Sequence, residues 1–126
     1  MKDNIKKRIL IIEDDFEMRR LEKDLLETAG YEVLESGNAK DGVKLAVKEK
    51  PDLVLMDVRL PSKKKGIGAA RILRNDEGTR DIPIIFVTAY AEGENTREIK
   101  NITGCEYITK PFHVRAFVKM VKRYIK

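Results

Sequence analysis

The sequence predicts an α/β domain in which a parallel β-sheet carries helices on both faces. Apolar runs without polar alternation at residues 9–12, 53–56 and 82–87 are typical of strands covered on both sides. Segments whose apolar residues recur at helical spacing separate them, and parallel neighbours need crossovers of about a dozen residues. Five strands and five helices therefore fill one domain, expected to span residues 1–126.

In the first half of the chain, each expected element has its own start and stop signals. Residues 8–12 form the first strand, Asp15 is the N-cap of a helix that begins at Phe16, and Gly30 is its stop. Residues 31–35 form a more polar strand near an edge of the sheet. Asn38 caps the second helix, and residues 53–57 form the third strand. The buried sides of the two helices are expected to contain Met18, Leu21, Leu25 and Ala29, then Ala39, Val43 and Ala46.

The second half continues the alternation. After a basic loop at residues 62–66 comes a third helix, then a strand within 81–88, a weakly amphipathic helix at 92–102 and a strand at 105–109. The last helix has the clearest pattern of apolar residues at i, i+3, i+4 and i+7. The apolar residues expected to anchor these three helices are Ile67, Ala70 and Leu73, then Ile99 and Ile102, then Val114, Phe117, Val118, Val121 and Ile125.

Polar side chains stand where four of the apolar runs end. Asp14 and Asp15 follow the first strand, Asp57 ends the third, Thr88 ends the fourth, and Lys110 follows the fifth. Ligands of parallel sheets bind beyond the carboxyl ends of the strands. A buried carboxylate without a partner is very unfavourable, so Asp57 implies a cation, a hydrogen-bond network or a strand end that opens into a cleft. We therefore expect these five residues to share one cleft.

Three carboxylates in one cleft indicate a metal site, because their mutual repulsion is relieved by a bound cation. Oxygen-rich, partly hydrated sites favour a hard divalent ion, which is Mg²⁺ in the cell, with Mn²⁺ as a laboratory substitute. Asp15 is expected to hold the metal directly and Asp14 directly or through water. Asp57 and the backbone carbonyl of Arg59 complete the set.

The same residues suit phosphoryl transfer, in which a protein mainly positions groups and neutralises charge. Asp57 is the expected nucleophile and phosphorylation site, and takes a phosphoryl group as a mixed anhydride. Thr88 and Lys110 are expected to contact the phosphoryl oxygens. No turnover of an external substrate is expected beyond slow hydrolysis of the aspartyl phosphate.

Four motifs in this set together resemble the receiver domains of two-component response regulators, over essentially the whole chain. They are Asp14-Asp15, Asp57 followed by Pro61, Thr88-Ala89, and Lys110-Pro111-Phe112. The resemblance implies a flavodoxin-like doubly wound sheet in the order 2-1-3-4-5. It also implies a cis peptide bond before Pro111, and phosphorylation of Asp57 by a histidine kinase or a histidine phosphotransfer protein.

The resemblance further implies a switch made by Thr88 and Tyr107, which turn toward the phosphoryl group together. The surface that changes is then the fourth helix, the fifth strand and the fifth helix, and it binds a downstream protein target or a second copy of the chain. The last helix is basic, which favours a partner with acidic residues. The rival hypothesis is a protein-binding module of the same fold that is never phosphorylated.

The sequence also departs from the receiver pattern. The loop after Pro61 is one residue longer than usual and reads Ser62-Lys63-Lys64-Lys65-Gly66, so it either attracts an anionic donor or partner or is simply solvated. Arg59 and Tyr90 stand two residues beyond Asp57 and Thr88, and we expect their bulk and charge to slow hydrolysis of the aspartyl phosphate.

Composition and missing motifs argue against other classes. The net charge of +5 is spread over all helices and mixed with 21 acids, which disfavours direct nucleic-acid binding. The apolar runs are too short to span a membrane, so a cytoplasmic location is expected. The single Cys105 cannot form an internal disulfide and is expected to be buried. A flavin-binding protein is disfavoured because Asp14-Asp15 would repel the flavin phosphate. A dinucleotide-binding enzyme is disfavoured because Gly66-Ile67-Gly68 lacks the third glycine of the phosphate-binding loop. A phosphohistidine carrier would depend on His113, which is expected at the surface.

Overall fold

The structure, a computed structural model, describes residues 6–57, 64–88, 94–109 and 113–125. Strands and helices alternate from the first element to the last. Their bounds are β1 Arg8–Glu13, α1 Phe16–Thr28, β2 Glu32–Ser36, α2 Ala39–Glu49, β3 Leu53–Asp57, α3 Lys64–Arg74, β4 Ile84–Thr88, α4 Glu94–Asn101, β5 Cys105–Thr109 and α5 Val114–Tyr124.

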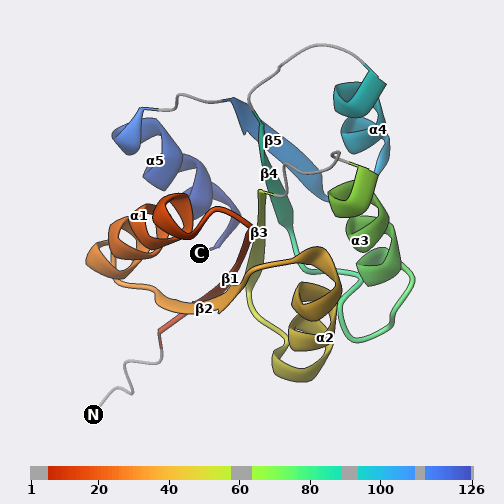
Figure 1. Ribbon diagram of the computed structural model, residues 1–126, viewed down its shortest axis with the longest axis horizontal. Coiled ribbons are helices and arrows are strands. Elements are labelled where there is room, and N and C mark those ends of the chain that lie inside the picture. The colour runs from red at the N-terminus through yellow and green to blue at the C-terminus, as the bar shows by residue number, and fades with distance from the viewer. Residues whose placement is uncertain (1–5, 58–63, 89–93, 110–112, 126) are drawn as a thin grey trace.

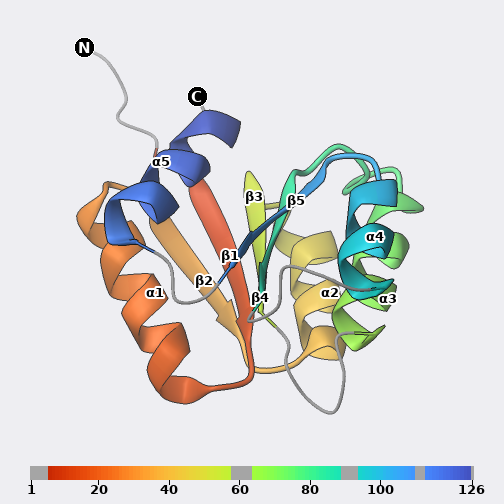
Figure 2. The same cartoon turned by 90° about the horizontal axis from the view of Figure 1, so that it is seen from above.

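The sheet has the order β2-β1-β3-β4-β5 with every neighbouring pair parallel, which confirms the predicted topology. Helices α1 and α5 cover one face, and α2, α3 and α4 cover the other (Figures 1 and 2). Because all strands run the same way, their carboxyl ends meet at one edge of the sheet. That edge holds Asp57 at the end of β3 and Thr88 at the end of β4.

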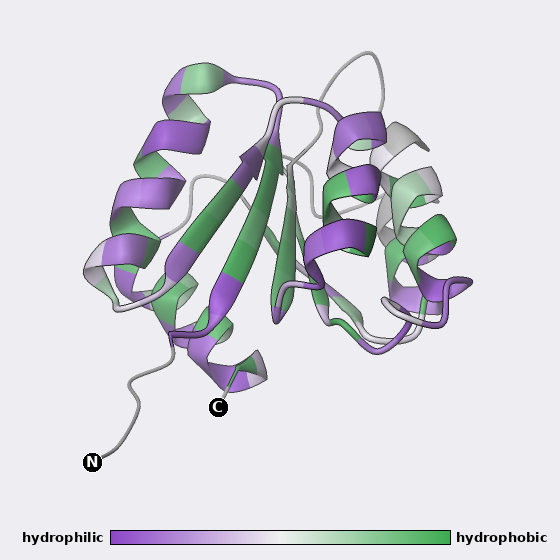
Figure 3. Cartoon of the chain, turned by 90° about the horizontal axis from the view of Figure 1, so that it is seen from below, coloured by the Kyte–Doolittle hydropathy of each residue, from purple (hydrophilic) through white to green (hydrophobic). Residues whose placement is uncertain are grey.

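Two separate hydrophobic layers flank the sheet, because successive residues of a strand point to opposite faces. In β1, Ile9 and Ile11 pack toward α1 and α5, where Phe117 is the largest buried side chain. Leu10 and Ile12 pack toward α2, α3 and α4. Figure 3 shows the result as hydrophobic strands between helices whose outer faces are hydrophilic.

The predicted helix boundaries are confirmed where a cap was recognised. Asp15 caps α1, and the chain leaves that helix through Gly30 at φ 103°, a backbone conformation that favours glycine. The Asn38 side chain accepts from the backbone N–H of Asp41 at 2.8 Å and starts α2. His113 stands before α5 and is exposed, as expected.

Some details of the predicted core are wrong. In α1 the buried residues are Glu22 and Leu26, whereas Leu21, which was expected to be buried, is 48% exposed. In α5, Val114 is half exposed, and the buried residues of the helix are Phe117 and Val121. Cys105 is only partly buried. Periodicity alone identifies a helix but fixes the centre of its buried face only to within one residue position.

No helix within the described residues has the length and apolar character needed to cross a membrane.

Candidate functional site

Glu13 lies at the centre of the candidate site, although the sequence-based set did not include it. It is the last residue of β1, and the strand register pairs its Cα with that of Asp57, the last residue of β3. Glu13 is fully buried, and it follows Ile9 and Ile11 on the face of the sheet that α1 and α5 cover. A buried carboxylate therefore stands beside the backbone of Asp57, with Asp14 exposed next to it.

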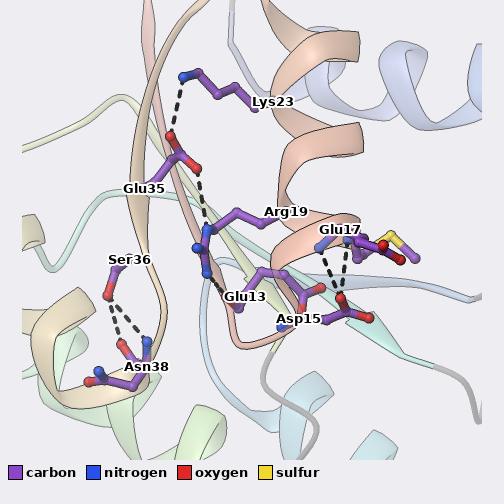
Figure 4. A network of polar contacts seen from close by, with 9 residues as sticks. Glu13, Asp15, Glu17, Arg19, Lys23, Glu35, Ser36 and Asn38 are labelled. Atoms are coloured by element: carbon purple, nitrogen blue, oxygen red, sulfur yellow. Dashed lines mark hydrogen bonds and ion pairs between the residues drawn. The ribbon is translucent and has the colours of Figure 1, made fainter.

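Asp15 has a defined structural role in the turn after β1. Its Oδ1 accepts from the backbone N–H groups of Glu17 at 3.0 Å and Met18 at 3.4 Å, so it caps α1. The Asp15 N–H donates to Oε2 of Glu13 at 2.8 Å. Figure 4 shows the resulting turn, in which the two carboxylates each hold backbone amides.

Arg19 fixes this turn to two further elements. Its Nη1 donates to the carbonyl oxygen of Glu13 at 2.6 Å, and its Nε donates to Oε1 of Glu35 on β2 at 3.2 Å (Figure 4). Lys23 contacts the other Glu35 oxygen at 3.2 Å, and the Arg19 guanidinium lies 5.5 Å from the centre of the Phe16 ring. The end of β1 is thus tied both to α1 and to the neighbouring strand.

The remaining predicted site residues are only partly described. Thr88 ends β4, in register with Thr109 on β5, so it belongs to the same edge of the sheet as Asp57. The side chains of Asp57 and Thr88 lie outside the described part of the structure. Lys110, Arg59 and Tyr90 also lie outside it, as does the peptide bond before Pro111.

Tyr107 lies on the opposite face of the sheet from Glu13. It is half-buried against the hydrophobic layer of α2, α3 and α4, and the Lys100 ammonium nitrogen is 5.5 Å from the centre of its ring. This contact connects α4 with β5, the two elements that the predicted switch involves.

The donor atoms at the end of β1 suit a hard cation. Among the side chains that the structure describes, no group of three metal-ligating residues gathers in one place. Glu13 nevertheless pairs with Asp57 in the strand register and Asp14 follows it in the chain, and carboxylate oxygens of this kind fit Mg²⁺. No local pattern reveals Glu13, because β1 is buried on both faces and only its pairing with β3 places Glu13 beside Asp57.

The fold and this edge define a doubly wound α/β protein with an acidic site at the carboxyl ends of its strands. Comparison with known proteins agrees with that class. The response regulator receiver domain family matches residues 9–122. A polar-differentiation response regulator, DivK of Brucella anthropi, is 38% identical over 120 residues, which are 94% of this chain and 96% of the relative.

Two solved structures are similar over most of the chain. The chemotaxis protein CheY4 of Vibrio cholerae superposes with a TM-score of 0.87, covering 96% of this chain and all of the other; at 23% identity it supports the fold alone. The receiver domain of the sensor histidine kinase PA1611 from Pseudomonas aeruginosa is 28% identical, with a TM-score of 0.85 over 96% of this chain and 98% of its own. That structure has a magnesium ion in its active-site cleft.

The chain belongs to the response regulator receiver domain family.

Proposed function

We propose that this receiver domain accepts a phosphoryl group on Asp57 from a histidine kinase or a histidine phosphotransfer protein. The register that sets the buried carboxylate of Glu13 beside Asp57 carries the proposal. In the reaction, a carboxylate oxygen of Asp57 forms a bond to phosphorus. The donor's bond to phosphorus breaks, and its electron pair leaves with the donor.

Thr88 ends the neighbouring strand and Lys110 follows the next one, so both are suited to contact the phosphoryl oxygens. Slow hydrolysis then resets the domain, without turnover of an external substrate. Arg59 and Tyr90 retard that step.

For the metal, we assign the principal ligands to Asp14, Asp57 and the Arg59 carbonyl, with Glu13 contributing directly or through water. Asp15, the direct ligand expected from the sequence, already uses one oxygen to cap α1, which supports giving its metal role to Asp14. Bound Mg²⁺, or Mn²⁺ in its place, would neutralise charge on the acidic cluster and on the phosphoryl oxygens.

Phosphorylation would then act as a switch through Thr88 and Tyr107. New charge-assisted hydrogen bonds to the phosphoryl group favour one arrangement of β4 and β5, and Tyr107 moves with them. The contact between Lys100 and the Tyr107 ring supports this role, because a turn of the ring changes the surface formed by α4, β5 and α5. A downstream protein or a second copy of the chain would read that surface, and the domain would act in the cytoplasm.

Intact-mass measurement tests the phosphorylation proposal. Incubation with Mg²⁺ and acetyl phosphate should add the mass of one phosphoryl group to the wild type and to Asp24→Asn, a matched change at an exposed site on α1. Asp57→Asn and an EDTA-treated sample should gain nothing. Equal labelling of Asp57→Asn would exclude Asp57 as the acceptor, and an unmodified wild type would favour the constitutive protein-binding module.

A further inference from the structure

An apolar groove of about 600 Å³ lies between α2 and α3. Ala39 and Val43 of α2 line it on one side, and Gly68, Ala69 and Ile72 of α3 line it on the other. Ile72 is 56% exposed, among the highest values for a large apolar residue in the described structure. A Cβ atom added at Gly68 would meet no atom within 4 Å, so the groove is open at this point.

The rim of this groove is basic. Lys40 and Lys44 of α2 both line it and are exposed, and among the described residues that line it none is acidic. Of the acids of α2, Glu49 pairs with Arg8 at 3.0 Å, away from the groove. Asp41 accepts from Nδ2 of the groove residue Asn38 at 3.0 Å, so one acid lies at the edge of the groove beside the two lysines that line it.

We propose that the groove between α2 and α3 docks a protein partner that presents a short amphipathic helix, with an apolar stripe flanked by aspartate or glutamate. Two neighbouring helices leave a channel that accepts the apolar ridge of a third. Exposed lysines along the rim attract acidic flanks and repel basic ones. A symmetric contact between two copies of this chain would bring Lys40 and Lys44 toward their own counterparts, which disfavours self-association through this face.

The test uses the ¹⁵N-labelled full chain and two synthetic helical peptides with the same leucine stripe, one flanked by glutamates and the other by lysines. The glutamate peptide should shift the amide resonances of residues 39–44 and 68–72. The lysine peptide should bind about tenfold more weakly or worse, because two ion pairs are replaced by repulsion. Added salt should weaken the binding of the glutamate peptide.

Variants test separately whether the apolar groove and the charge of its lysines contribute to binding. Ile72→Asp should abolish binding of the glutamate peptide, whereas Leu21→Asp, the same change at an exposed aliphatic residue of α1, should leave it unchanged. Lys40→Glu combined with Lys44→Glu should reverse the preference between the peptides. Circular dichroism establishes that each variant is folded.

The proposal would be overturned by equal affinity for both peptides, by shifts confined to another surface, by the absence of shifts at millimolar peptide, or by an equal loss of binding in Leu21→Asp. Concentration-dependent shifts of residues 39–44 and 68–72 without any peptide would also overturn it, in favour of self-association.

Discussion

Replacing Arg19 with glutamine should destabilise the protein through the turn that follows β1. The guanidinium of Arg19 donates to the carbonyl of the fully buried Glu13 at 2.6 Å and pairs with Glu35 at 3.2 Å. A charge-assisted hydrogen bond contributes about 1.5–3 kcal/mol, and a partly exposed ion pair contributes roughly 0.2–1 kcal/mol. We expect Arg19→Gln to lower the free energy of unfolding by about 2–3 kcal/mol.

The matched control for this change is Glu35→Gln, which removes the ion pairs of Glu35 with Arg19 and Lys23 and leaves the hydrogen bond to the Glu13 carbonyl in place. It should cost less than about 1 kcal/mol, since Glu35 is about one-third exposed. Urea denaturation followed by circular dichroism measures both values, and the double variant gives the coupling between the two side chains. If Arg19→Gln is no less stable than Glu35→Gln, the Glu13 carbonyl does not depend on Arg19 and our reasoning fails.

Three further changes test other parts of the structure. Gly42→Ala should destabilise by more than about 1 kcal/mol, because the new Cβ would clash with the buried side chain of Ile12 on β1. Gly68→Ala should stabilise by about 0.5–1 kcal/mol, because its Cβ would meet open space on a helix, and thermal denaturation should show opposite signs for the two variants. Asp14→Asn should weaken Mg²⁺ binding, measured by calorimetric titration. Asp15→Asn keeps a side chain that can cap α1 and should change the Mg²⁺ affinity little. A larger loss of affinity in Asp15→Asn than in Asp14→Asn would return the direct metal role to Asp15. Burial raises the pKa of the Cys105 thiol, although Arg74 and Arg71 oppose the shift, so the folded protein holds this proton more tightly. The protonated thiol stabilises the folded state at pH values below its ordinary pKa, and this stabilisation is lost as the pH rises through the raised pKa of the folded state. Alkylation of Cys105 at pH 8 should therefore be slower in the folded chain than in the urea-unfolded chain, and equal rates would contradict this prediction.

Sequence patterns predicted the fold because each strand and helix has independent local signals. Continuous apolar runs identify buried parallel strands, and residues such as Asn38 and Gly30 mark helix ends through their own hydrogen bonds and backbone angles. The face of α1 was harder to predict. Glu22 is buried although it is charged, and Leu21 is exposed although it is apolar, because tertiary packing decides which side of a helix meets the sheet.

For the candidate site, the structure bears on the residues at the end of β1. Asp15 was expected both to cap α1 and to bind the metal, and the structure shows the capping role. Glu13 was missed because a glutamate at the end of an apolar strand reads as a transition to solvent. Only the register with β3 places it beside Asp57, and pairing between strands is not visible in a local pattern.

The division of the interior into two hydrophobic layers has an evolutionary consequence. The sheet separates the residues that pack under α1 and α5 from those that pack under α2, α3 and α4, so a substitution in one layer has few neighbours in the other. During evolution, residues in one layer can therefore be substituted to suit a new interaction, while the packing of the other layer is kept unchanged.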